Sequence, residues 1–289
     1  MTASNTTLNR WVIDANYLET DALHQWLARR RGNIAVLSHP TMIELHKRDA
    51  VRTIQLALRI CCQYPRQVLV LRNTQELIAL TGRSKGLINR LINHTETGQF
   101  GEYCRTVIDV GPTSDIKAHI APLETQAVAL LDSLTKSAAN LMIRLAQADD
   151  IFTPIERREL RSALSRKRPM SGPLQRRTCL MALDLTQELT QAAGLPPIVV
   201  PARFSELVNR LAFRYASMIV GYYIVRKDKD GPWLSNPERQ LNQLVDLKIA
   251  GIASYFDGLK TNEPDLQATF GVGQSLIRAL GGYTFCGRG

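Results

Sequence analysis

Four acidic residues of this chain stand where a parallel sheet would gather them: Asp14, Glu44, Asp246 and Glu263. Carboxylate oxygens are the ligands that Mg²⁺ and Mn²⁺ prefer. Carboxylates that converge on such a cation allow it to polarise a phosphate and to activate a water. In parallel α/β sheets, sites form at the carboxyl ends of the strands and at the adjoining helix N-termini. The chemistry of these acids therefore depends on the elements that carry them.

Asp14 comes near the end of the first predicted strand. Residues 11–15, WVIDA, form a short apolar run, and a helical pattern follows over residues 20–30. Such a run before a helical pattern is typical of a buried strand that leads into a helix. Asp14 is therefore expected at the carboxyl edge of a sheet.

Glu44 follows the second predicted strand, residues 33–38 with the sequence NIAVLS. Pro40 suits the first turn of a helix, and helical periodicity continues from there to Cys62. Glu44 lies early in that helix, so we expect it at the same edge of the sheet as Asp14.

A third strand is predicted over residues 67–71, and Asn73 and Glu76 then have the spacing of a capping box that opens another helix. The order βαβαβα predicts the α/β class with a mostly parallel sheet. Residues 107–110 are weighed as a further short strand.

Asp246 and Glu263 are brought to one level by helix and strand geometry. A helix is predicted from Asn236 to about Phe256, and a strand over residues 258–261. From Asp246 to Asp257 the helix would descend about 16 Å, and the extended chain would climb about 20 Å to Glu263. Glu263 therefore returns to the level of Asp246, whereas Asp257 stays at the far end.

The middle of the chain has a helical pattern over residues 122–226, with a capping signal at Thr153-Pro-Ile-Glu156. We interpret residues 121–235 as an all-α insertion in a core formed by residues 1–120 and 236–289.

Three segments resemble the acidic motifs of PIN-domain nucleases, in the same order: VIDANYL (12–18), LSHPTMIELHK (37–47) and LVDLKIAGIASYFDGLKTNEPDL (244–266). The resemblance implies a PIN-like three-layer core with a mostly parallel central sheet. It also implies that Mg²⁺ or Mn²⁺ is held by Asp14, Glu44, Asp246 and Glu263, with Asn16 and Thr261 in support; Asp265, just beyond the last strand, is a lesser candidate. The chain departs from the family in its long middle segment and in Glu263, where Asp is commoner.

This resemblance further implies an endoribonuclease, because small microbial PIN proteins commonly cut RNA, toxin and defence effectors among them. Two alternatives stay open: a catalytically silent PIN-like scaffold that binds nucleic acid or protein, and a structure-specific DNA nuclease. Arg90 and His94 are also weakly similar to the Arg/His motif of metal-independent HEPN ribonucleases, with a spacing one residue shorter than usual.

The formal charge of +10 favours polyanionic partners. We expect nucleic acid, and RNA before DNA. Basic residues gather between residues 151 and 180, and helical spacing puts Arg157, Arg161 and Arg168 on one face beside Arg158. That face would contact a nucleic-acid backbone, or be merely solvated. The insertion could instead bind a regulatory protein or a second copy of the chain.

Neither a signal-like apolar segment nor a run long enough to span a bilayer is seen, so we expect a cytoplasmic protein without membrane contact. The apolar run over residues 216–225 predicts a buried core helix. The five cysteines show no disulfide-type spacing, and reduced, structural thiols are expected.

Overall fold

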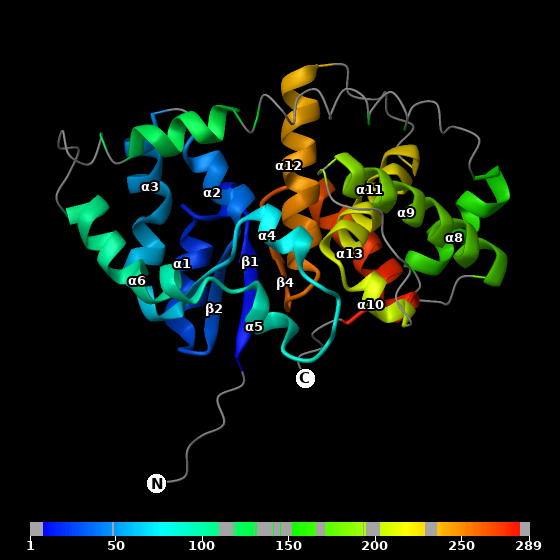
Figure 1. Ribbon diagram of the computed structural model, residues 1–289, viewed down its shortest axis with the longest axis horizontal. Helices are drawn as coiled ribbons and strands as arrows, with labels where there is room; N and C mark the ends of the chain where they lie inside the picture. The colour runs from blue at the N-terminus through cyan, green and yellow to red at the C-terminus, as the bar shows by residue number, and fades with distance from the viewer. Residues whose placement is uncertain are drawn as a thin grey trace, which may run out of the picture.

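The computed structural model describes residues 8–47, 49–109, 118, 120–129, 131, 141, 145, 152–165, 171–192, 194, 203–228 and 236–283. Within these residues, four strands form one sheet in the order β3-β2-β1-β4, and every neighbouring pair is parallel (Figure 1). The strands are β1 (Asn9–Ile13), β2 (Asn33–Leu37), β3 (Val68–Val70) and β4 (Gly258–Lys260). The α/β class with a parallel sheet is therefore confirmed.

The strands form because apolar side chains can fill both faces of the sheet. Val12 of β1 and Val36 of β2 are paired in register and belong to one apolar cluster. Their neighbours Ile13, Ala35 and Leu37 belong to a second cluster on the opposite face. Side chains alternate between faces along a strand, so a continuous apolar run indicates a strand that is covered on both sides.

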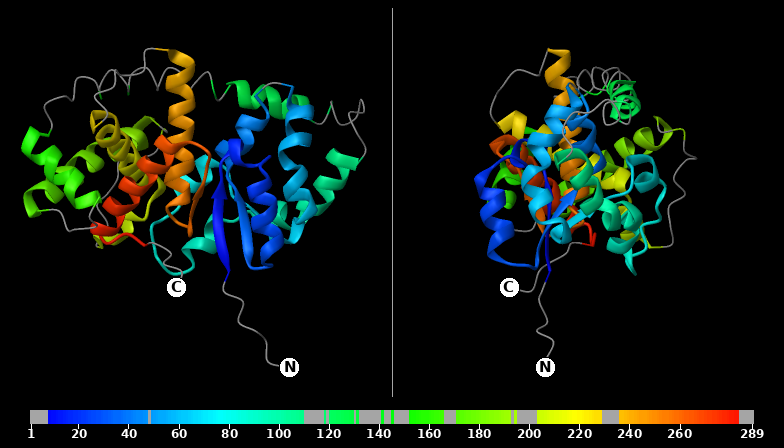
Figure 2. Two further views of the ribbon diagram at one scale, coloured as in Figure 1. Left: turned by 180° about the vertical axis from the view of Figure 1, so that it is seen from behind. Right: turned by 90° about the vertical axis from the view of Figure 1, so that its left-hand side faces the viewer.

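Helices cover both faces of this sheet (Figures 1 and 2). One face packs against α1 (Asp21–Arg29), α3 (Ala50–Gln63) and α6 (His94–Cys104). The other face packs against α12 (Pro237–Ala253), and α4 (Thr74–Ala79), α5 (Leu87–Leu91), α11 (Leu211–Asp228) and α13 (Pro264–Ala279) extend the same apolar cluster. The sheet is thus the middle layer of three.

Two predicted helix starts are confirmed. The Asn73 side chain accepts a hydrogen bond from the Glu76 backbone N–H at 2.9 Å, and the Glu76 carboxylate accepts one from the Asn73 N–H at 3.0 Å. Asn236 caps α12 by accepting from the N–H groups of Glu238 and Arg239. These bonds satisfy donors that the first turn of a helix leaves without partners.

The helix predicted from Pro40 to Cys62 is wrong in one respect, because the structure breaks it into α2 (His39–Leu45) and α3. The His46 imidazole bonds to the Met42 carbonyl at 2.6 Å, and Asp49 has a left-handed φ of 43°. A side chain that takes a helical carbonyl competes with the backbone ladder, and a non-glycine residue at positive φ ends helical geometry. Glu44 consequently lies in the last turn of a short helix.

Two further predictions need correction. Residues 105–109 form a π-helical turn, η3 (Arg105–Asp109), where a strand over residues 107–110 was weighed; residue 110 is outside the described residues. The helix expected to reach Phe256 ends at Ala253, because the chain turns there to enter β4. Apolar residues continue past both points, so the sequence pattern indicates neither the π-helical turn nor the end of α12.

The expectation of reduced thiols is wrong for Cys62 and Cys104, which form a disulfide between α3 and α6 with a Cα–Cα distance of 5.4 Å. Both helices pack on the same face of the sheet. The separation of 42 residues gave no local signal of this pairing. Cys61, next to it, is a buried free thiol.

The described part of the middle segment is helical, and its helix α11 packs against α12 and α13. Its helices include α8 (Pro154–Ser165), α9 (Gly172–Ala192) and α10 (Phe204–Val208). The apolar run of α11 is buried, as predicted, and shares one apolar cluster with β1, α9 and α12. None of the described helices is long and apolar enough to cross a membrane. The division into a core and an insertion at residues 121 and 235 remains a prediction.

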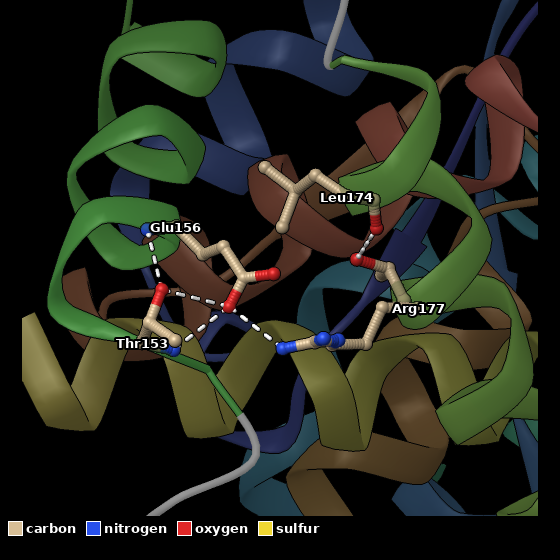
Figure 3. A network of polar contacts seen from close by, with 5 residues as sticks. Thr153, Glu156, Leu174 and Arg177 are labelled. Carbon is tan, nitrogen blue, oxygen red and sulfur yellow. Dashed lines mark hydrogen bonds and ion pairs between the residues drawn. The ribbon is translucent and has the colours of Figure 1, made fainter.

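Helices α8 and α9 are joined through one carboxylate (Figure 3). Glu156 accepts hydrogen bonds from the Thr153 N–H at 2.8 Å and from its hydroxyl at 2.9 Å, which confirms the capping signal. The same carboxylate pairs with Arg177 of α9 at 2.8 Å. The pair lies at the surface, so it orients the two helices more than it stabilises them.

Candidate active site

Asp14 lies at the carboxyl end of β1 and is only 2% exposed. Its backbone N–H continues the ladder to the Lys260 carbonyl, and its side chain accepts from the Ala15 N–H at 2.8 Å and from the Thr261 hydroxyl at 2.7 Å. Burial raises the pKa of this carboxyl, and the hydrogen bonds from Thr261 and Ala15 oppose that rise. The two donors fix both carboxylate oxygens, so Asp14 is the most rigidly held of the four acids.

Asn16 ties the end of β1 to the end of β4. Its Oδ1 accepts from the Asn262 N–H at 3.1 Å, and its amide nitrogen donates to Glu263 at 3.3 Å. The Asn262 side chain returns a bond to the Asn16 carbonyl at 2.8 Å, and the Glu263 N–H donates to the Thr261 hydroxyl at 3.0 Å. These bonds place Glu263 beside Asp14 across 249 positions of sequence.

Glu44 is carried by α2, whose start is anchored to the same edge of the sheet. The Ser38 side chain caps the helix by accepting from the Thr41 N–H, and the Thr41 hydroxyl donates to the Ile13 carbonyl at 3.1 Å. Burial, together with the charges of Asp14 and Glu263, raises the pKa of Glu44 to about 7, and the charge of Lys47 opposes this rise. Glu44 therefore lies close enough to Asp14 and Glu263 for their charges to change its pKa.

Asp246 points from α12 toward the same group and is 8% exposed. Burial raises its pKa to about 9, and the charges of Glu263, Asp14 and Glu44 contribute in that order. A hydrogen bond between the carboxyls of Asp246 and Glu263 favours the protonated form of Asp246 and lowers the pKa of Glu263, although burial leaves that pKa raised overall. The structure thus brings all four predicted acids within electrostatic reach of one another.

Two other acids near the sequence motif lie elsewhere. Asp257 accepts a hydrogen bond at 2.6 Å from the N–H of Arg10, near the beginning of β1. Asp257 therefore lies at the end of the sheet opposite to the four acids, as helix and strand rise predicted. Asp265 is in the first turn of α13, where its charge raises the pKa of Glu263. Asp265 therefore borders the four acids.

The donor chemistry of the four acids fits a hard divalent cation. Glu44, Asp246 and Glu263 each have a pKa that both burial and the other acids raise, and the charge of Lys47 partly offsets this rise for Glu44. Such a group gains most from a bound cation. In the part of the chain that the structure describes, however, no three His, Cys, Asp or Glu side chains form a ready ligand set. Cation binding would therefore require the carboxyls to turn toward a common point.

Two of the basic residues predicted to contact nucleic acid, Arg157 and Arg158, are not beside these acids. Arg157 and Arg158 lie on α8, which is at one end of the molecule, beyond α9 and α11 as seen from the sheet (Figures 1 and 2). The Arg158 guanidinium contacts the Pro154 carbonyl at 3.5 Å. The side chain of Arg161 and the whole of Arg168 lie outside the described residues.

Sequence patterns missed two residues of the site. Asn262 bridges to the Asn16 backbone, and Lys47 reaches across to Asn242 of α12 at 3.1 Å while its charge lowers the pKa of Glu44. The only signal was the polar run that follows the last strand. Arg90 and His94, weighed as a metal-independent pair, fall on separate helices, and Arg90 donates to the Thr81 carbonyl.

The stability of the metal-free protein is expected to fall as the pH rises. Folded Glu44 and Asp246 hold their protons to about pH 7 and 9, whereas unfolded they would lose them near their ordinary values of 4.5 and 3.8. Between these limits the folded state binds more protons, so the free energy of unfolding decreases with rising pH. Urea unfolding in EDTA from about pH 5 to about pH 9 measures this. A Glu44→Gln, Asp246→Asn double variant should show a much flatter profile; an equally steep one would contradict the assignment.

Comparison of the chain with protein-family models, with curated proteins and with solved structures gave no match in any of the three. The resemblance to PIN-domain nucleases is therefore carried by the ordered acidic motifs themselves.

Proposed function

We propose that this protein is a PIN-like, Mg²⁺- or Mn²⁺-dependent endoribonuclease. The observation that supports this most is the mutual influence of four carboxyl groups, Asp14, Glu44, Asp246 and Glu263, at the carboxyl edge of a parallel sheet. Asp14 and Glu263 follow the ends of β1 and β4, and Glu44 and Asp246 reach the same edge from α2 and α12; this edge is where α/β proteins hold ligands. Acids with perturbed pKa values that gather in one place are a mark of functional sites.

Asp14, Glu44, Asp246 and Glu263 would hold the cation, which when bound supplies Lewis acidity toward a phosphate and toward a water. Asp14 is already oriented by Ala15 and Thr261. Asn16 donates a hydrogen bond to the Glu263 carboxylate. The hydrogen bond between Asp246 and Glu263 favours the form in which Asp246 carries the proton. Asp246 must give up that proton for both carboxylates to act as ligands.

RNA is the proposed substrate because of the resemblance to small microbial PIN ribonucleases and because the chain carries a net charge of +10. The charge itself would suit DNA equally. Cleavage assays should therefore include single-stranded RNA, single-stranded DNA and branched DNA.

Asp14→Asn is expected to lower Mn²⁺-dependent RNA cleavage by at least about 10²-fold, since a catalytic cation supplies several kcal/mol of transition-state stabilisation and each 1.36 kcal/mol is tenfold. The matched control is Asp257→Asn at the opposite end of the sheet, where an amide oxygen can still accept from Arg10. Single-turnover cleavage of a labelled RNA compares the two variants. If Asp14→Asn cuts as fast as wild type, the four acids are not the active site.

A silent PIN-like scaffold is the second candidate, and one observation favours it: the described residues include no preassembled set of three metal-ligating side chains. A scaffold would bind RNA without cutting it at any Mn²⁺ concentration. Binding without cleavage in the wild-type protein, unchanged in Asp14→Asn, is the outcome that selects this alternative.

A further inference from the structure

Beside the four acids, one lysine is surrounded by three aromatic rings. The Lys260 ammonium lies 4.7 Å from the ring centre of Trp26, 5.0 Å from that of Trp11 and 5.4 Å from that of Tyr17. A cation within about 6 Å of a ring centre is attracted by the ring's negative face. We call these four residues the aromatic platform.

The aromatic platform comes from four separate elements. Trp11 is in β1, Tyr17 ends the 3₁₀ turn η1 (Ala15–Tyr17), Trp26 is in α1 and Lys260 is the last residue of β4. All four side chains are half-buried, so they sit at the surface with their apolar parts packed inward. Seen from behind, α1 and β4 lie on either side of β1 (Figure 2).

Close packing holds the Trp11 ring of the platform in place. The Trp11 indole N–H donates to Asn9 at 2.7 Å. A Cβ atom added to Gly258 would lie 2.6 Å from the Trp11 ring, so glycine at this position lets the ring lie directly on β4. A ring that is already fixed loses little conformational entropy when a ligand stacks on it.

The platform is continuous with the candidate active site along two segments. Tyr17 follows Asn16, which binds Glu263, and Lys260 immediately precedes Thr261, which binds Asp14. A strand of nucleic acid with one phosphate at the acids would therefore reach Tyr17 and Lys260 first, because these two platform residues adjoin the site along the chain. Lysine and aromatic rings together are the combination that binds single-stranded nucleic acids, by phosphate pairing and base stacking.

We propose that the aromatic platform binds the bases of single-stranded nucleic acid next to the four acids. The inference rests on the proposed function, because the four acids set the position of the bound strand. It extends the proposed function by making an unpaired strand the preferred substrate. Bases in a duplex are stacked on one another and have no free face for Trp11, Tyr17 or Trp26. The Lys260 ammonium would pair with a phosphate of the same strand.

Binding in EDTA tests this without cleavage, with a fluorescein-labelled 12-nucleotide oligouridylate and a 12-base-pair RNA duplex as probes. Tyr17→Ala and Trp26→Ala should each weaken binding of the single strand about tenfold, since a stacked base contributes about 1–3 kcal/mol. Lys260→Gln should weaken it less and reduce the salt dependence by about one phosphate contact. Matched controls are Phe204→Ala, an exposed aromatic on α10, and Lys85→Gln, an exposed lysine; both should bind within about twofold of wild type.

The possible outcomes distinguish a failure of the platform proposal from a failure of the proposed active site. Platform variants that bind the single strand like wild type would overturn the platform, yet leave the result of the Asp14→Asn cleavage assay standing. Wild-type binding that is equal for duplex and single strand, or undetectable for both, would also overturn it. Circular dichroism checks folding; should Trp26→Ala fail to fold, Tyr17→Ala and Lys260→Gln still decide the matter.

Discussion

Asp246→Asn is expected to abolish Mn²⁺-dependent RNA cleavage and, at the same time, to make the metal-free protein more stable. Asp246 is nearly buried, and its pKa is raised to about 9 by burial and by three neighbouring acids. Asparagine has nearly the same shape as aspartate but carries no charge. The substitution therefore removes the free-energy cost of burying a carboxyl group among other acids. A gain of roughly 2 kcal/mol would raise the melting temperature by about 4–8 °C for a chain of this size.

The opposed signs of these two effects are what make the variant informative. If the carboxyl has a purely structural role, replacing it lowers the stability of the protein. A carboxyl that is kept for cation binding lowers the stability of the metal-free protein, so replacing it raises that stability. Thermal melts in EDTA and in Mg²⁺ measure this: Mg²⁺ should stabilise the wild type and have little effect on Asp246→Asn. A variant that is less stable than wild type in EDTA and still cuts RNA would refute the proposed role. Asp257→Asn is again the control, with no gain in stability expected.

Arg214→Met is expected to destabilise the protein by about 3–5 kcal/mol, because it leaves several buried acceptors without a donor, each at a cost of about 1–3 kcal/mol. Arg214 is 0% exposed, and its guanidinium donates to the Ser254 carbonyl at 2.7 Å, to the Ser254 hydroxyl at 3.0 Å and to Asn209 at 3.0 Å. It also donates to the Tyr283 carbonyl and stacks 3.8 Å from the centre of the Tyr255 ring. Methionine fills much of the volume but leaves these acceptors without donors.

This network matters to the candidate active site because Ser254 caps the C-terminus of α12, the helix that carries Asp246. A cation there satisfies a terminal carbonyl and interacts favourably with the helix dipole. Burial lowers the pKa of Arg214 to about 10, so it stays charged at neutral pH. Urea unfolding compares it with Arg278→Met, an exposed arginine on α13 that should change stability by less than about 1 kcal/mol. Equal midpoints for Arg214→Met and wild type would contradict the prediction.

Local patterns predicted most of the sheet and its order of elements. Strand β2 was expected within one residue and β1 within two, because continuous apolar runs between turn signals need only nearest neighbours to be recognised. The capping boxes at Asn73 and Thr153 were equally local, since donor and acceptor are three residues apart. The placement of Asp14, Glu44, Asp246 and Glu263 at one sheet edge followed from the same strands together with helix and strand rise.

Local patterns failed where a side chain interrupts a regular element. The break between α2 and α3 depends on His46 bonding back to Met42 and on the left-handed backbone at Asp49, and the apolar periodicity on both sides hides it. The disulfide between Cys62 and Cys104 is another such failure, because it depends on the packing of α3 against α6.

The sequence by itself therefore determined the α/β class, the parallel order of the first strands and the acids that stand at their ends. Only the tertiary structure decided that Asp14 is held by Thr261, that Lys260 lies among Trp11, Tyr17 and Trp26, and that Arg214 is buried at the end of α12. Secondary structure is encoded over a few residues by periodicity and capping. Contacts between residues up to 249 positions apart form only when whole helices and strands pack, so their geometry is absent from any local pattern.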